Sequence, residues 1–186
     1  MTPVFPPIPP RMEAVLLMLI VAAAVFDVRY RRIPNWLTVS GVVLGVALNS
    51  AIGRPEAGTA FALEGLALGF GLYFILYLLH AMGAGDVKLM AAIGALAGPT
   101  NWFGIFVVSA IVGGVMALLL AVARGRLKST FWNMGFIVGE MTRGRPAYVN
   151  KAELDVKNPK SVGLPHGAVI AIGTIFFLAS APHFTK

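Results

Sequence analysis

The sequence contains no cysteine, which excludes disulfide bonds and cysteine-ligated zinc and leaves the redox compartment open. Charged residues are also scarce, because they make up 12% of the chain against about a quarter in soluble domains. Hydrophobic residues make up 58%, and the mean hydropathy is +0.80. This balance predicts a membrane protein. The apolar runs do not alternate with polar residues, so they favour helices over the strands of a barrel.

Six apolar runs predict an all-α bundle of about six transmembrane helices. They cover residues 12–28, 36–52, 60–82, 87–98, 102–123 and 164–181. The fourth is short, with about a dozen residues where a spanning helix needs about 20. The first residues lack the basic start of a signal peptide, so the first run is interpreted as a retained helix. We expect one membrane-embedded domain over residues 1–186, in which residues 124–163 form a cytoplasmic segment between the last two helices.

The basic residues predict how the bundle is oriented. If the N-terminus lies outside, twelve of the fifteen lysines and arginines fall on the cytoplasmic side: three after the first run, one after the motif GAGD, and eight in residues 124–160. Basic loops remain cytoplasmic in membrane proteins. We therefore expect both termini to lie outside.

Glycine pairs recur at four-residue spacing along the predicted helices. They are Gly41 and Gly45, Gly65 and Gly69, and Gly94 and Gly98. This spacing lets the backbones of two helices approach closely in lipid, although glycine is also common in membrane helices without such a role.

Two acids fall at the same predicted membrane face, because Asp27 closes the first helix and Asp86 opens the fourth. With a rise of about 1.5 Å per residue and a hydrocarbon core of about 30 Å, both should lie below the cytoplasmic surface. Submerged acids usually face the bundle interior or a water-filled cavity. Two carboxylates that approach closely share a proton, and such a pair can activate water and hydrogen-bond a peptide carbonyl.

The residues alone leave other interpretations of these acids open. Asp86 follows GAG and precedes an apolar helix, where it could be an N-cap. Asp27 could pair with Arg29, Arg31 or Arg32. A proton-coupled membrane transporter would also place acids within a helix bundle.

Three segments carry a family resemblance: FDVRYRRIPNWLT, GAGDVKLMAAIG and LPHGAVIAIG. They resemble, in order, the segment with the first aspartate, the GxGD motif and the late Pro-x-Gly segment of the type IV prepilin peptidases, which are membrane aspartic proteases. Together they span residues 20–175. The resemblance implies that Asp27 and Asp86 are the catalytic pair, at the cytoplasmic face of the bacterial inner membrane.

The resemblance also implies an activity, namely removal of the short leader peptide from prepilins and pseudopilins. No metal and no cofactor are expected. The expected partners are a membrane-inserted prepilin helix with a basic leader, and membrane lipids; nucleic acid is not expected. A proton-coupled transporter and a non-catalytic assembly factor of a pilus or secretion machine remain alternatives.

The subtype is inferred from a departure from the larger members of the family. Larger bifunctional members carry an N-terminal region with paired CxxC motifs that is linked to methylation, whereas this chain has no cysteine and begins shortly before its first helix. We therefore expect the small, peptidase-only type of Flp (tight-adherence) pilus systems, without methyltransferase activity.

Residues around the two motifs are expected to shape the site. Gly83 and Gly85 permit a tight turn and close backbone approach beside Asp86. Pro34 and Asn35 are interpreted as structural, with Asn35 a plausible cap of the second helix.

Several cationic or titratable residues have two open interpretations. Lys88 either reaches lipid phosphates or contacts an acidic substrate residue. Arg29, Arg31 and Arg32 either anchor the first helix at the anionic leaflet or recognise the leader or an acidic residue just after the cut. His166 stands where small members often carry an aromatic residue, and either touches the chemistry or is structural.

Overall fold

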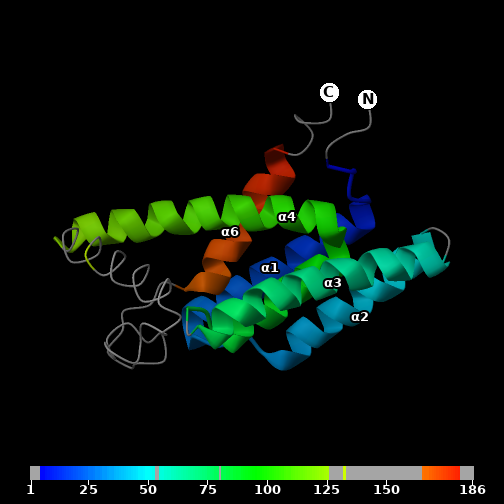
Figure 1. Ribbon diagram of the computed structural model, residues 1–186, viewed down its shortest axis with the longest axis horizontal. Coiled ribbons are helices and arrows are strands. Elements are labelled where there is room, and N and C mark those ends of the chain that lie inside the picture. Colours follow the sequence, from blue (N-terminus) through cyan, green and yellow to red (C-terminus); the bar gives the residue numbers. More distant parts are fainter. Residues whose placement is uncertain (1–4, 53–54, 80, 126–131, 133–164, 181–186) are drawn as a thin grey trace.

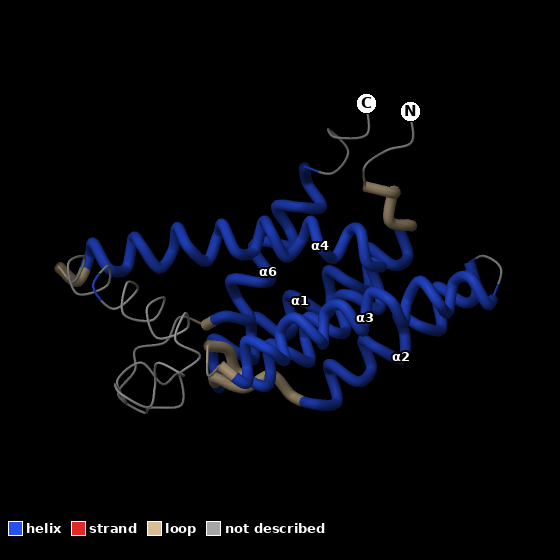
Figure 2. The backbone as a smooth tube through the Cα atoms, in the orientation of Figure 1, coloured by secondary structure: helices blue, strands red, loops and turns tan. Residues whose placement is uncertain are grey.

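The computed structural model describes residues 5–52, 55–79, 81–125, 132 and 165–180. Within these residues the elements are helices, and no strand is present (Figures 1 and 2). The helices are α1 (Pro10–Tyr30), α2 (Asn35–Ile52), α3 (Pro55–Leu78), α4 (Ala84–Ala123) and α6 (His166–Ser180). The prediction of an all-α protein is confirmed. The predicted cytoplasmic segment 124–163 lies almost entirely outside the described residues.

The predicted fourth and fifth helices correspond to the two halves of α4, which are two helices that meet at a sharp kink. Gly98 interrupts α4 with φ 73° and ψ 173°, and Pro99 follows directly. Proline disfavours helical geometry at the residue before it and lacks a backbone N–H, so the chain changes direction here. The predicted break between the fourth and fifth helices is confirmed, because Trp102 Nε1 in the second half donates a hydrogen bond of 3.0 Å to the carbonyl oxygen of Met90 in the first half, so the second half folds back on the first. The expected count of six transmembrane helices is not confirmed.

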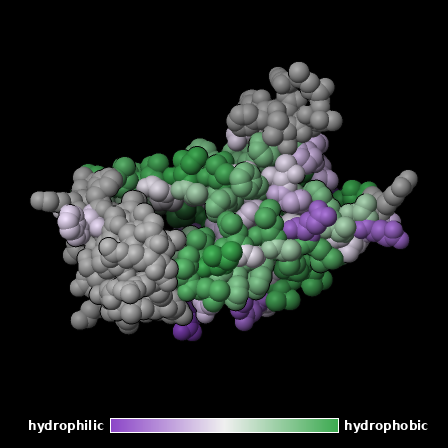
Figure 3. Space-filling view, viewed as in Figure 1, coloured by the Kyte–Doolittle hydropathy of each residue, from purple (hydrophilic) through white to green (hydrophobic). Residues whose placement is uncertain are grey.

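Three helices are long and apolar enough to cross a membrane, namely α2, α3 and α4. Helix α6, with 15 residues, is shorter than these three. Helix α1 carries charged residues near both of its ends, among them Arg11 and Arg29. Large hydrophobic side chains are exposed along the helices, and apolar surface dominates the face shown in Figure 3. Such a surface suits lipid contact, so the chain is a membrane protein.

Helices α2 and α3 both pack on the first half of α4 through small residues. A Cβ atom built on Gly65 would collide with the backbone of Gly94, and one built on Gly45 would lie 2.7 Å from the backbone carbon of Ala95. The buried Asn49 side chain also donates a hydrogen bond of 2.9 Å to the carbonyl oxygen of Ala95. The glycine spacing therefore corresponds to close helix contact, as side-chain volume is absent where the backbones meet.

Aromatic and polar contacts join the start of the chain to the end of α6. The Phe5 and Phe177 rings pack edge to face with centroids 5.2 Å apart. Asn101, just after the kink in α4, donates a hydrogen bond of 3.0 Å to the carbonyl oxygen of Pro6. The start of α1 and the end of α6 therefore meet at one end of the bundle, while the end of α1 and the start of α6 lie towards the other.

Candidate active site

Asp27 and Asp86 line the same cavity, whose volume is about 510 Å³. The cavity lies where α1 ends and α4 begins. Only 9% of Asp27 and 7% of Asp86 are exposed, so both carboxylates are largely withdrawn from solvent. The volume falls within the range of about 300–1,000 Å³ that is typical of ligand-binding clefts.

Asp27 is held between the last turn of α1 and the first turn of α6. Helix α1 is capped by Arg31, which adopts a left-handed conformation (φ 53°) and donates its backbone N–H to the carbonyl oxygen of Asp27 at 2.9 Å. The side-chain Oδ2 of Asp27 accepts a hydrogen bond of 2.8 Å from the backbone N–H of Gly167. Free N–H groups at a helix start favour a negative charge, so α6 both orients and stabilises this carboxylate.

Asp86 lies in the first turn of α4, three residues after the N-cap position, which Gly83 occupies. Its Oδ2 accepts a hydrogen bond of 3.2 Å from the backbone N–H of Gly83. An acid at this position closes the helix start from within, as in a capping box. The alternative that Asp86 is itself the N-cap is therefore wrong. Asp27 and His166 both interact electrostatically with Asp86.

Ile33 lines the cavity and Gly167 holds Asp27, and both were missing from the predicted site. A Cβ atom on Gly85 would lie 3.4 Å from the Ile33 side chain, and one on Gly167 would lie 3.1 Å from it. Ile33 is buried, so it fills the space between the backbones that carry the two acids. Ile33 belongs to the motif segment Ile-Pro-Asn and Gly167 to Pro-His-Gly. Their place in these motifs was the sequence signal that could have identified them.

Lys88 and Asn35 connect α4 with α2. The Nζ of Lys88 donates a hydrogen bond of 2.8 Å to Oδ1 of Asn35, across 53 positions of sequence. Both residues line the cavity with the aspartates. Asn35 is the first residue of α2, and its side chain is used in the contact between the two helices.

The remaining predicted residues divide into two groups. Among the described residues, the cavity is also lined by Arg31, Arg32, Pro34, Gly83 and Gly85. Arg29 does not line it, and its guanidinium lies over the Tyr30 ring, 5.7 Å from the centroid. His166 opens α6 and is half-buried near Asp86. The fold thus gathers both motifs around one cavity, and the start of α6 lies against Asp27 beside it.

This arrangement is suited to acid–base chemistry on a bound amide. Two carboxylates on different helices border one cavity, and each is oriented by a backbone N–H. A pair that holds one proton offers a base and an acid at the same time. Arg31, Arg32 and Lys88 add positive charge to the same walls.

Comparisons with known proteins agree on one family. A model described as "Type IV leader peptidase family" matches residues 14–118. The chain is 31% identical over 123 residues to a "Prepilin leader peptidase/N-methyltransferase" of Xanthomonas campestris pv. campestris, a match that covers 62% of the chain and 42% of the relative. It is 31% identical over 119 residues to a protein of the same description from Myxococcus xanthus, covering 60% and 35%. The chain thus matches less than half the length of these relatives. No solved structure matches significantly.

Proposed function

Because the chain belongs to the type IV leader peptidase family, we propose that it is an aspartic endopeptidase that removes the leader peptide from prepilins. The observation that carries this proposal is that Asp27 and Asp86, from helices α1 and α4, line one cavity in a membrane-embedded bundle. The matched region contains both residues and ends within α4. The two curated relatives carry prepilin leader peptidase in their descriptions.

The proposed reaction uses the two carboxyl groups in complementary states. The ionised carboxylate takes a proton from a water molecule, and the water oxygen attacks the carbonyl carbon of the scissile peptide bond. The protonated carboxyl group hydrogen-bonds the carbonyl oxygen as negative charge develops there. The carboxyl group that took the proton from water then gives it to the amine nitrogen as the C–N bond breaks. The Gly167 and Gly83 N–H groups hold the two side chains in place during these steps.

The finer assignment is also a proposal. The resemblance of the sequence motifs, together with the absence of cysteine, favours Flp-type prepilins and pseudopilins as substrates, cleavage without N-methylation, and an active site at the cytoplasmic face of the inner membrane. Mass measurement of a co-expressed Flp-type pilin tests the first two of these points at once, because it reports both the removal of the leader and any added methyl group.

Neutral replacements of the two acids test the proposal directly. We expect Asp27→Asn and Asp86→Asn each to reduce leader removal from a co-expressed prepilin by at least about 10³-fold, since acid–base groups that act as a unit are not replaceable singly. Leader removal is followed as a mobility shift on a gel. Glu64→Gln is the matched control, because Glu64 is an exposed acid on α3 away from the cavity; it should process normally.

Two results would overturn the proposal. The first is a wild-type protein that leaves the prepilin uncut. The second is normal processing by both asparagine variants at wild-type expression.

A further inference from the structure

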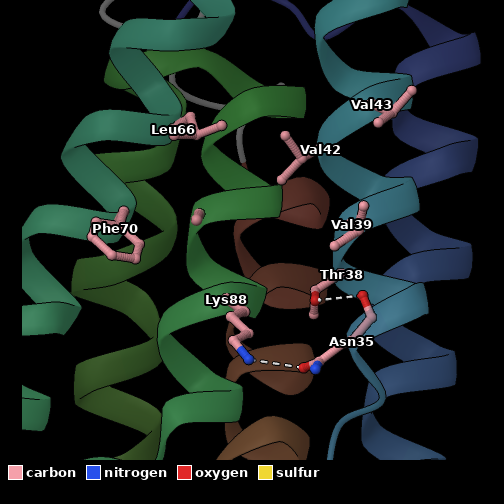
Figure 4. A pocket seen from close by; sticks show the side chains of 9 residues that line it. Asn35, Thr38, Val39, Val42, Val43, Leu66, Phe70 and Lys88 are labelled. Carbon is pink, nitrogen blue, oxygen red and sulfur yellow. Dashed lines mark hydrogen bonds between the residues drawn. The ribbon is translucent and has the colours of Figure 1, made fainter.

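A second cavity lies between α2, α3 and the first half of α4, with a volume of about 390 Å³. Its walls are apolar: Val39 and Val42 project from α2, and Leu66 and Phe70 lie opposite on α3 (Figure 4). We refer to it as the α2–α3 groove. Val39 is 58% exposed and Phe70 is 44% exposed, so the groove opens to the surface of the bundle. On a membrane-embedded protein that surface faces lipid.

The α2–α3 groove adjoins the aspartate cavity. Asn35 and Lys88 line both of them. The hydrogen bond between Lys88 Nζ and Asn35 Oδ1 crosses one end of the groove, as Figure 4 shows. Asn35 and Lys88 therefore stand at the end nearest the two acids, and the other residues that line the groove are apolar except for Thr38.

The packing of the helices explains why the groove is open at this end. At the far end, a Cβ atom on Gly58 of α3 would collide with the carbonyl group of Asn49 of α2, so the two helices touch. Towards the aspartates, α3 remains against α4 through Gly69, which meets the backbone of Met90. Valine and phenylalanine side chains stand between α2 and α3 there, and the small Ala91 lines the groove from α4.

We propose that the α2–α3 groove binds the apolar transmembrane helix of the protein substrate, and that the polar segment adjoining this helix passes the Lys88–Asn35 pair to reach Asp27 and Asp86. This inference rests on the proposed peptidase function. A helix lying along an apolar groove buries hydrophobic side chains without leaving backbone groups unpaired in lipid. The continuity with the aspartate cavity is what favours a protein over a lipid acyl chain, because a lipid presents no peptide bond to the two carboxylates.

Filling the groove tests its role against a matched position. Val39→Trp places a bulky ring in the groove, whereas Leu44→Trp places the same ring on the same helix at a residue that is 45% exposed and does not line the groove. We expect Val39→Trp to raise the KM for a full-length, membrane-inserted prepilin by at least about tenfold with little change in kcat. Leu44→Trp should stay within about twofold of wild type.

Photo-cross-linking covers the case in which Val39→Trp fails to fold. A photoreactive phenylalanine analogue is placed at position 39 or 44 of the Asp86→Asn protein, which holds the prepilin without cutting it. A prepilin-sized adduct from position 39 and none from position 44 supports the groove. Lipid adducts alone, or equal prepilin adducts from both positions, overturn it.

The two proposals fail in different ways. If Val39→Trp cleaves the prepilin with wild-type KM, the proposed role of the α2–α3 groove is wrong, while the proposed peptidase function stands. If the wild-type protein cuts no prepilin, the proposed peptidase function is wrong. A prepilin adduct at position 39 would then still show that the prepilin binds in the groove.

Discussion

Among single residues, Gly167 has the least room for change beside the candidate site. A Cβ atom at this position would lie 3.1 Å from both Cβ and Oδ2 of Asp27, and 3.1 Å from the Ile33 side chain. Such contacts are too short to be absorbed without a shift of a neighbour. One neighbour is the carboxylate that the Gly167 N–H orients, so the position combines a hydrogen bond with steric control.

Gly167→Ala should therefore lower kcat by about ten- to hundredfold, because a displacement of about 1 Å at a catalytic group is costly. The KM should change less, since the α2–α3 groove is untouched. Initial rates of prepilin cleavage measure both constants. Gly71→Ala is the control, as nothing lies within 4 Å of a Cβ atom on that glycine. Equal kcat values for the two variants would show that Gly167 does not position Asp27.

The candidate acids could be predicted from sequence, and so could Gly83 beside Asp86, but the residues that hold Asp27 could not. Asp27 and Asp86 stand out because charges are rare in apolar runs and costly in a membrane. Gly167 and Ile33 carry no such local signal. Their roles depend on α6 packing beside the end of α1, a contact between residues 140 positions apart. The pairing of Lys88 with Asn35 likewise depends on how α2 and α4 are placed together.

Among the helices, α4 contains the most distinctive backbone feature. Gly98 has φ 73° and ψ 173°, a region that is open almost only to glycine. A Cβ atom here would also collide with the ring of Phe61 on α3. The sequence Gly-Pro predicted a break at this point. Whether the break would be a loop or a kink was not predictable, because it depends on packing by Phe61 and on the contact between Asn101 and Pro6.

Gly98→Ala should lower the free energy of unfolding by about 2–4 kcal/mol, from backbone strain and the collision with Phe61 together. Thermal unfolding in detergent measures the loss. Gly114→Ala in the same helix is the control, because the space around it is open; it should be neutral or slightly stabilising. Adding Phe61→Ala to Gly98→Ala removes the collision but leaves the strain. A fully stable Gly98→Ala protein would contradict a kink fixed by this glycine.

For the whole molecule, the two ends of the bundle have different chemistry. One end joins Phe5, Phe177 and the kink of α4 through aromatic packing and the hydrogen bond from Asn101. The other end holds the aspartate cavity, with its positive side chains. Helix α3 spans the distance between the ends, since 24 residues correspond to a length of about 36 Å, more than the hydrocarbon core of about 30 Å. The basic residues at the aspartate end favour its placement on the cytoplasmic side of the membrane.

Single-cysteine labelling tests this orientation, and the absence of native cysteine removes background. Ala57 lies in the first turn of α3 and Ala81 just after its end, and both are exposed. With both termini outside, a membrane-impermeant maleimide should label Ala57→Cys in intact spheroplasts and Ala81→Cys only after permeabilisation. Both variants should react in detergent, which shows that each thiol is accessible. The reverse pattern would place Asp27 and Asp86 at the outer face, and leader removal in the cytoplasm would then be ruled out.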